Sequence, residues 1–326
     1  MGIHAQIDDW LLGRGRSINP KRGGGSGISF KQGTGFKNLQ AASLKKPEVM
    51  VKIPKRTGNS TGKTGIKNHL DYIGRNGQVA IEDKDGFIHQ SKGQAREIAQ
   101  RWHDAGYLSS SGKKREALNI VLSMPPGTPP ESVRDAAREF AKTAFSDHEY
   151  VFALHTDEPH PHVHLMVSMQ NELGQRMNPR KNDLYHWRVL FAEKMREQGV
   201  DCAATRRQHR GQTQKADNGI IRNIQKRGKV PEVQKQHIQE FMQALKDNKR
   251  PLHPFLKEQM QTRKIIQENY TGFAMALYRE GFKTEARAIS QLANQLGQAN
   301  TQTKAQAQFD TVKGNLTRSK DIDIER

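Results

Sequence analysis

The sequence predicts an α+β fold in which a central antiparallel sheet is flanked by helices and followed by a helical C-terminal region. Three observations support this prediction. Runs with the two-residue alternation of strands are interleaved with runs of helical spacing. Two of the strand-like runs are joined by a short proline-containing loop, as in a hairpin. From about Pro231 onward the patterns are helical and amphipathic.

Each expected element has its own pattern. Residues 48–54 read as the first strand. Residues 66–75 carry three apolar side chains at helical spacing and stop at an Asn-Gly pair. A strand over residues 117–124 ends at a Pro-Pro-Gly break, and an apolar stripe with an acidic first turn predicts a helix over residues 131–144. A further helix over residues 184–198 is followed by a glycine.

The most informative stretch contains three histidines. Alternate residues up to His155 share one strand face, and in the next run His162 and His164 share one face. Two prolines within residues 156–161 favour a connecting loop, so a hairpin closed there sets His155 opposite His162. Three imidazoles then converge, which predicts a divalent metal site with positions left open for a substrate. The alternative is an exposed histidine-rich loop that holds no metal.

The charge distribution indicates a polyanionic partner. The chain of 326 residues has a net charge of +19, and nucleic acid is the first expectation. Thirteen Lys and Arg residues against three Asp and Glu residues give Met1 to Lys67 a net charge of +10. Residues 1–46 are expected to be a flexible basic arm. An anionic membrane is the alternative partner, but the sequence has neither a long apolar run nor a clear basic anchor helix.

Cysteine usage and the N-terminus bear on the compartment. The N-terminus lacks the apolar core of a signal peptide, and the single cysteine, Cys202, fits a reducing environment. We therefore expect a cytoplasmic protein without membrane insertion, in which Cys202 is buried or half-buried. At the other end, Gln and Asn dominate residues 290–308, which are expected to form a frayed helix or a tail.

The glycine-rich stretch at residues 55–65, KRTGNSTGKTG, invites comparison with the phosphate-binding loop of nucleotide hydrolases. The spacing does not fit, because Thr57 stands where that motif needs glycine. A mobile glycine-rich flap over a basic groove explains the same residues.

A basic protein with a three-histidine site and a tyrosine near an arginine suggests phosphoryl transfer on nucleic acid. Tyr72 lies near the end of the helix expected over residues 66–75, close to Arg75. Its hydroxyl, once deprotonated, would attack phosphorus and form a covalent 5′-phosphotyrosine. Because the ordinary pKa of a phenol is about 10, activation is required. A bound cation or Arg75 would favour the phenolate, and Asp157 or a histidine would accept the proton.

The spacing His155-x-Asp157-x-x-x-x-His162-x-His164 resembles the third motif of the conjugative relaxases, the HUH endonucleases that nick plasmid transfer origins. The similarity is greatest to the P-type mobilisation branch, which includes the border endonuclease of tumour-inducing plasmids. NHLDYIGRNG is similar to the first motif of that family, and ALNIVLSMPPGTPPE to the second. With the following stretch, NPRKNDLYHWRVLFAEKMREQGVDCAATRRQHRG, the resemblance covers residues 47–212.

The resemblance implies roles for the residues in these motifs. It implies His155, His162 and His164 as ligands of Mg²⁺, Mn²⁺ or Zn²⁺, and Tyr72 as the nucleophile. It implies Asp157 as a group that orients a histidine or accepts a proton. The serine of the second motif and nearby basic residues are expected to contact DNA: Ser123, Lys52, Lys55, Arg56, Lys63, Arg75, Arg206 and Arg207.

Two residues are left with open roles. His160 is out of phase with the ligand face, and we expect it to support a ligand or face DNA. Tyr185 is a rival nucleophile, because rolling-circle replication initiators of the same superfamily carry their tyrosine on a helix after the two-histidine motif. Those proteins usually have a lysine three residues after the tyrosine, where this chain has Arg188.

The leading functional hypothesis is a relaxase that cleaves and rejoins one strand at a transfer origin. The alternatives are a rolling-circle replication initiator, a non-catalytic DNA-binding accessory protein and a zinc hydrolase of small molecules. Expected partners are single-stranded or melted origin DNA, a relaxosome accessory protein, the coupling protein of a type IV secretion channel, or a second copy. The expected division is a basic arm over residues 1–46, a bacterial relaxase domain over residues 47–212 and a partner-binding helical region over residues 213–326.

Overall fold

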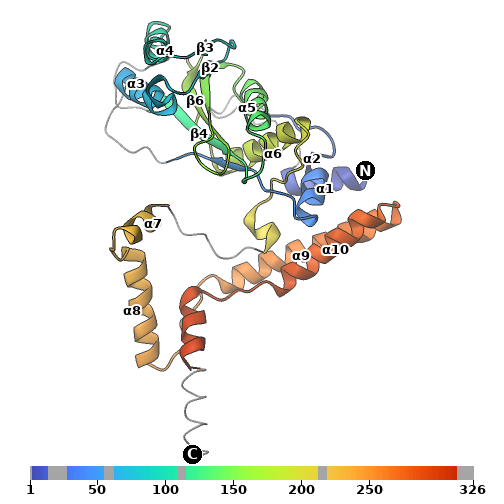
Figure 1. Cartoon of the computed structure of the whole chain (residues 1–326). Coiled ribbons are helices and arrows are strands. Elements are labelled where there is room, and N and C mark those ends of the chain that lie inside the picture. Colours follow the sequence, from blue (N-terminus) through green and yellow to red (C-terminus); the bar gives the residue numbers. More distant parts are fainter. Residues whose placement is uncertain (1, 14–27, 55–61, 109–114, 212–218, 314–326) are drawn as a thin grey trace, which may run out of the picture. The chain divides into compact units, whose positions relative to one another are not determined.

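The computed structural model describes residues 2–13, 28–54, 62–108, 115–211 and 219–313 (Figure 1). By packing, the chain divides into two compact units. The first comprises Met1–Arg206 together with Met275–Ile289, and the second comprises Arg207–Ala274 together with Ser290–Arg326.

The first unit is built on one six-stranded antiparallel sheet, in the order β1-β4-β6-β5-β2-β3. This sheet, with its flanking helices, confirms the predicted α+β class. The strands are β1 (Met50–Lys52), β2 (Ile81–Asp83), β3 (Ile88–His89), β4 (Ala117–Ser123), β5 (His148–His155) and β6 (His162–Asn171).

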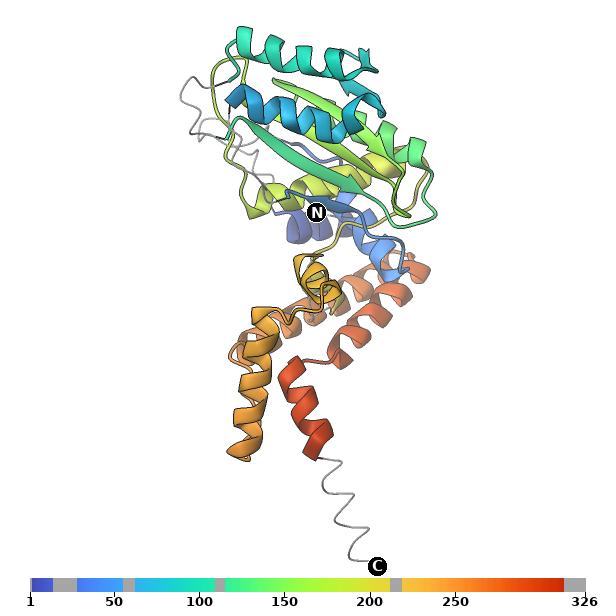
Figure 2. The same cartoon turned by 60° about the vertical axis from the view of Figure 1, so that its left-hand side comes forward.

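Helices cover both faces of this sheet (Figures 1 and 2). On one face lie α5 and α6, which pack on apolar residues such as Val163 and Leu165 of β6. On the other face lie α3 and α4, which pack on Ala153 and Met166. Successive strand residues point to opposite faces, so the alternation in the sequence fills two separate cores. The helices are α3 (Gly62–Ile73), α4 (Lys92–Asp104), α5 (Pro130–Ala144) and α6 (Lys181–Glu197).

The prediction of a flexible arm over residues 1–46 is wrong for two segments, which form α1 (Ile3–Leu12) and α2 (Thr34–Ser43). Every fourth residue of α1, beginning at Ile3, is buried, and that stripe is enough for a packed helix. The Asp8 carboxylate accepts hydrogen bonds from the backbone N–H groups of Gly33 and Phe36, at 2.5 and 3.1 Å. These two hydrogen bonds satisfy backbone N–H groups at the start of α2 that have no partner within the helix. The glycine-rich residues 14–27 lie outside the described part of the chain.

Besides α1 and α2, three elements of the first unit were not predicted: β2, β3 and α4. The start of α4 is a capping box, in which Ser91 and Gln94 satisfy each other's backbone N–H groups. Of the flap predicted over residues 55–65, residues 62–65 instead form the start of α3, and residues 55–61 lie outside the described residues. Cys202 is fully buried, as expected.

The C-terminal region is helical, as predicted. Its core includes Tyr270, which is fully buried and whose hydroxyl donates to the carbonyl of His209 at 3.3 Å. The Gln- and Asn-rich residues 290–308, expected to form a frayed helix or a tail, are mostly helical: one helix with a buried Leu296 extends to Gln298, and residues 304–313 form another. Among the helices described, none is long and apolar enough to cross a membrane. The elements are η3 (Arg207–Arg210), α7 (Gly219–Lys226), α8 (Glu232–Lys246), α9 (Leu256–Arg279) and α10 (Lys283–Gln298).

Candidate active site

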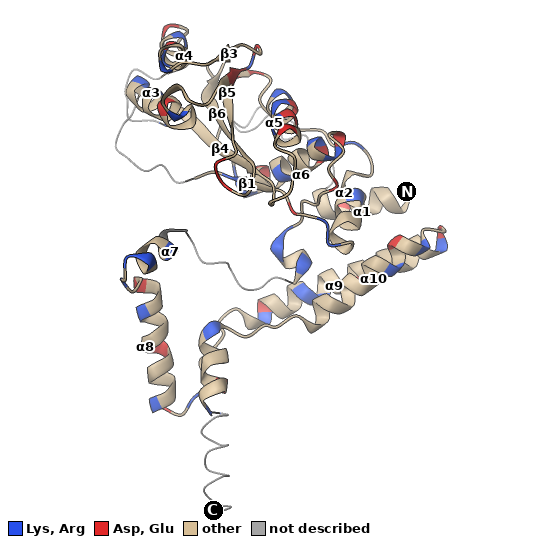
Figure 3. Ribbon diagram, in the orientation of Figure 1, with Lys and Arg blue, Asp and Glu red and all other residues tan. Residues whose placement is uncertain are grey.

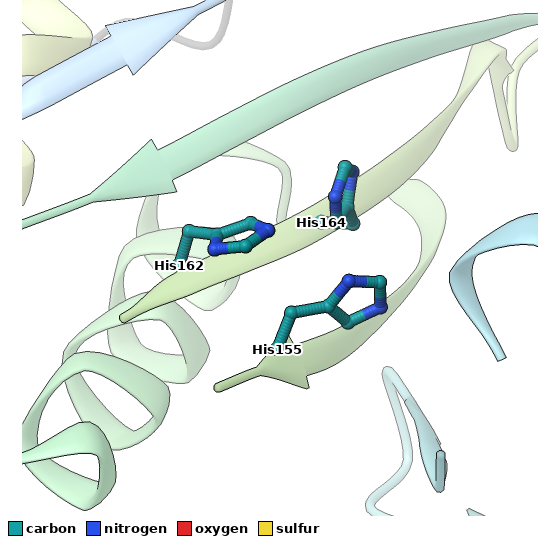
Figure 4. A group of neighbouring side chains, drawn as sticks. All are labelled: His155, His162 and His164. Carbon is teal, nitrogen blue, oxygen red and sulfur yellow. The ribbon is translucent and has the colours of Figure 1, made fainter. Parts of the chain in front are cut away.

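Three histidine side chains converge where two neighbouring strands meet their connecting loop (Figure 4). β5 ends at His155, β6 begins at His162, and these two residues pair directly. His164 is two residues further along β6 and therefore shares the face of His162. One ligand atom from each imidazole lies within 4.8 Å of the other two. The predicted hairpin and the convergence of its histidines are confirmed, whereas their role as metal ligands stays a prediction.

Backbone carbonyl groups orient two of these rings. His155 Nε2 lies 2.6 Å from the carbonyl oxygen of Ile73, and His162 Nδ1 lies 3.2 Å from that of His160. A ring nitrogen that donates to a carbonyl carries the proton, so the other ring nitrogen keeps its lone pair. Metal-binding histidines commonly have such an outer partner. His160 therefore supports the cluster through its main chain.

Burial keeps the imidazoles of His155 and His164 neutral. Burial first, and then the charges of neighbouring histidines and Arg75, lower the pKa of His164 to about 3. Burial also lowers the pKa of His155. The neutral form is the one that binds a metal. The carbonyl partners of His155 and His162 and the spacing of the three rings fit a divalent cation, and an all-imidazole set suits Zn²⁺ and similar transition-metal ions better than Mg²⁺.

Tyr72 lies beside this cluster. Its ring meets the ring of His164 edge to face, with centroids 5.5 Å apart. The side chain is 52% exposed, because the buried stripe of α3 is formed by other residues, among them Leu70 and Ile73. A half-exposed phenol next to the histidine face is open to a substrate phosphate. The sequence alone separates Tyr72 from His164 by 92 positions, and the packing of α3 on the sheet brings them together.

Arg75 connects Tyr72 with the histidine cluster. Its guanidinium carbon lies 5.6 Å from the centre of the Tyr72 ring. Its Nη2 donates to Asp157 Oδ2 at 2.5 Å and lies 3.3 Å from His155 Nδ1. The Asp157 carboxylate is 4.0 Å from that same nitrogen, too far for a hydrogen bond. His155 is therefore oriented by Ile73, while Asp157 is held by Arg75.

A left-handed turn after α3 presents the Arg75 side chain. Arg75, Asn76 and Gly77 have φ angles of 48°, 58° and 95°. This region is unfavourable for arginine, so the surroundings must hold it. Lys92 Nζ donates to Asn76 Oδ1 at 2.9 Å. Gly77 lies so close to the start of α4 that a Cβ there would come within 2.8 Å of the Lys92 backbone nitrogen.

Tyr185, the rival nucleophile, lies on the opposite face of the sheet. Its helix, α6, packs in the core that faces away from the histidines, and its side chain is 6% exposed. Burial raises the pKa of Tyr185 to about 12. The Arg206 guanidinium, predicted to contact DNA, lies 4.3 Å from the centre of this ring. A buried phenol on the other face cannot reach a phosphate at the histidines without a large rearrangement, which leaves Tyr72 as the candidate nucleophile.

The remaining predicted DNA contacts differ in exposure. Ser123 pairs with His162 and so shares the face of the histidines, but it is 2% exposed. This burial argues against its predicted direct contact with DNA. Lys52 is exposed at the end of β1. Lys63, in the first turn of α3, donates to the side-chain oxygen of Gln100. The other two predicted contacts are outside the described residues: Lys55 and Arg56.

The second unit has a cavity and a basic segment of its own. Arg207, the last of the predicted DNA contacts, lines a cavity of about 330 Å³ together with Glu258 and Arg263. Basic residues are frequent on α7 and the turn that follows it (Figure 3): Arg222, Lys226, Arg227 and Lys229.

One residue of the site was not anticipated from the sequence. His69 lies three residues before Tyr72 on α3, and the two rings pack at 24° with centroids 5.8 Å apart. Its Nδ1 is 3.5 Å from the side-chain nitrogen of Asn119 on β4. The sequence could have indicated His69, because residues three apart on a helix are neighbours on its surface.

Comparison with known proteins agrees with this arrangement. The family model described as "Relaxase: MobA/VirD2-like, nuclease domain" matches residues 72–200, a range that begins at Tyr72 and includes all three histidines. The chain is 28% identical over 184 residues to a T-DNA border endonuclease VirD2 of Rhizobium radiobacter, over 50% of this chain and 43% of the relative. It is 27% identical over 188 residues to the VirD2 of Agrobacterium fabrum, over 52% of this chain and 42% of the relative.

The aligned segments thus cover less than half of each relative's length. The range matched by the family model, residues 72–200, falls on the unit that carries the sheet, the histidine cluster and Tyr72. Residues 72–200 are therefore a relaxase nuclease domain of the MobA/VirD2-like branch.

Proposed function

We propose that this protein nicks and rejoins one DNA strand at a plasmid transfer origin and so initiates conjugative transfer. The observation that carries the proposal is the position of Tyr72, whose ring lies 5.5 Å from that of His164 in a three-histidine cluster. The match to a relaxase nuclease domain and the similarity to proteins named as border endonucleases support it.

In the proposed reaction Tyr72 is the nucleophile. Its phenolic oxygen attacks the scissile phosphorus while the bond from phosphorus to the 3′ oxygen breaks. The strand leaves with a 3′ hydroxyl, and the 5′ phosphate stays on the tyrosine. The phenol proton passes to a nearby base, for which Asp157 is the candidate. Because one phosphodiester replaces another, the step needs no ATP, and attack by a 3′ hydroxyl reverses it.

Positive charge around the phosphate supports this chemistry. Arg75 places its positive charge beside the Tyr72 ring. His155, His162 and His164 would hold a divalent cation, with Mg²⁺, Mn²⁺ and Zn²⁺ as candidates. When bound, such an ion supplies positive charge to a non-bridging oxygen of the phosphate.

The alternatives have less support. A rolling-circle replication initiator with Tyr185 as nucleophile requires a buried side chain on the opposite face to become accessible. A non-catalytic accessory protein explains the net charge of +19 but gives no role to the histidine cluster. A zinc hydrolase of small molecules explains the histidines but not the charge. For the C-terminal helices we propose a relaxosome accessory protein or a secretion coupling protein as partners.

The test uses single-stranded oligonucleotides tiled across the DNA that flanks the gene, since a relaxase gene commonly lies near its own origin. Each oligonucleotide is labelled at its 3′ end and incubated with protein and Mn²⁺. We expect one of them to give a covalent protein–DNA band on a denaturing gel. EDTA and Tyr72→Phe should abolish the band, and Tyr185→Phe should leave it. Tight binding without any adduct would instead support the accessory-protein alternative.

A further inference from the structure

We propose that the cavity of the second unit binds a small phosphorylated ligand of the size of a nucleoside monophosphate. The cavity has a volume of about 330 Å³ and lies between η3 and the first half of α9. All of its lining residues belong to the second unit. It therefore lies outside the relaxase nuclease domain, residues 72–200, and the proposal does not depend on the nicking reaction.

One face of α9 forms a wall of this cavity. Gln259, Arg263 and Ile266 line it and recur every three or four residues, so they share one side of the helix. One turn further along the same side, Tyr270 fixes η3 to α9, because its hydroxyl donates to the carbonyl of His209 at 3.3 Å. The cavity is thus bounded by two elements that a buried contact holds together.

Arg263 is the residue that indicates an anion. It is 9% exposed, and its Nη1 donates to the backbone carbonyl of Ala299 at 2.5 Å. Among the described residues no carboxylate, that of Glu258 included, forms an ion pair with its guanidinium. A buried charge without a counter-ion is costly, and proteins normally pair it. A phosphate in the cavity would provide the missing charge, and its oxygens match the two parallel donors of a guanidinium.

The other lining residues call for more than a bare anion. The side-chain oxygen of Gln259 is buried and has no hydrogen-bond partner in the described part of the chain. Glu258 adds a second acceptor to the lining. These acceptors require donor groups on the ligand, such as the hydroxyls of a ribose or the amino group of a base. The volume of about 330 Å³ is near the lower end for small-molecule sites, which favours one nucleotide over a dinucleotide.

The test is the binding of 5′-AMP to the full chain, measured by isothermal titration calorimetry in EDTA so that no metal at the histidines contributes. We expect one AMP per protein, weaker binding of inorganic phosphate, and no binding of adenosine, which lacks the phosphate. Arg263→Met keeps much of the side-chain length but removes the charge. It should weaken AMP binding by about tenfold or more, as expected for lost hydrogen bonds to a charged group.

The matched control is Lys264→Met, at the next residue of α9. The Lys264 side chain is 78% exposed and pairs with Glu268, so this variant should bind AMP with the affinity of the wild type. Gln259→Leu gives a second reading that does not depend on the folding of Arg263→Met. It removes the buried acceptor and should weaken AMP binding by about threefold or more.

Three results would overturn the proposal. The first is the absence of AMP binding to the wild type, and the second is an unchanged affinity in both Arg263→Met and Gln259→Leu. The third is displacement of AMP by an oligothymidylate, which would assign the cavity to a nucleotide of DNA rather than to a free ligand. Because none of these measurements involves cleavage, their failure leaves the proposed nicking function untouched.

Discussion

Replacing Arg75 by glycine should separate the stability of the protein from its activity. Arg75 has a φ of 48°, and a left-handed conformation costs a residue with a side chain about 1–2 kcal/mol, which glycine does not incur. Against this gain stand the lost contact with the Tyr72 ring, about 0.5–1 kcal/mol, and the added freedom of glycine in the unfolded chain, about 0.5–1 kcal/mol. The ion pair with the exposed Asp157 contributes little.

These contributions nearly cancel, so the free energy of unfolding of Arg75→Gly should lie within about 1 kcal/mol of wild type. Activity should behave differently. The substitution removes the group that links Tyr72 to the histidine cluster, and misplacement of a reacting group by about 1 Å can cost on the order of 100-fold in rate. Urea unfolding gives the first quantity, and the rate of covalent adduct formation gives the second.

Lys45 supplies a matched control. It is exposed after α2 with a φ of 55°, so Lys45→Gly should relieve the same strain without touching the site. The free energy of unfolding of this variant should exceed that of the wild type by up to about 1 kcal/mol, and the variant should form the adduct at the wild-type rate. An Arg75→Gly variant that forms the adduct as fast as wild type would refute the role assigned to Arg75. A decrease of more than about 3 kcal/mol in the free energy of unfolding of Arg75→Gly would refute the strain assigned to this turn.

Three further predictions concern the cluster and the turn. In EDTA, the lowered pKa of His164, about 3 when folded against 6.5 when unfolded, means that the unfolded chain takes up a proton first. The free energy of unfolding of the wild type should therefore fall by up to about 2 kcal/mol as pH drops from 7.5 to 5. The decrease should be smaller in His164→Asn, and urea unfolding at both pH values measures it. Mn²⁺ at 100 times its dissociation constant should stabilise the wild type by about 2.7 kcal/mol in thermal unfolding, and His162→Ala should lose this shift. Gly77→Ala should cost about 2 kcal/mol or more, because its Cβ would meet the Lys92 backbone nitrogen at 2.8 Å, whereas Gly86→Ala, with open space around it, should cost only the strain of its φ of 87°.

The histidine hairpin was predictable because its determinants are local. The two-residue alternation fixes the face of each histidine, and the length of the proline-containing loop fixes the pairing of His155 with His162. The position of Tyr72 beside the histidines could not be predicted from the residues near it in the sequence. It depends on how α3 packs over the sheet, and before the structure only the family resemblance suggested it.

Other features escaped prediction for identifiable reasons. The stripe beginning at Ile3 spans only ten residues, and the glycine-rich segment after it dominated the composition of the first 46. The capping box at Ser91 and the buried Trp102 mark α4 clearly, but most of its surface is polar. The side of α6 that carries Tyr185 could not be assigned from spacing, because both sides of that helix hold apolar residues. The left-handed turn at Arg75 depends on contacts with α4, which is distant in sequence.

The most direct test of the central claim is the identity of the residue that carries the DNA. Protein is incubated with the cleaved oligonucleotide, the adduct is digested with trypsin and nuclease, and the modified peptide is sequenced by mass spectrometry. The account predicts a 5′ nucleotide on Tyr72, in the peptide that follows Lys67. A nucleotide on Tyr185, or one attached through its 3′ phosphate, would contradict it.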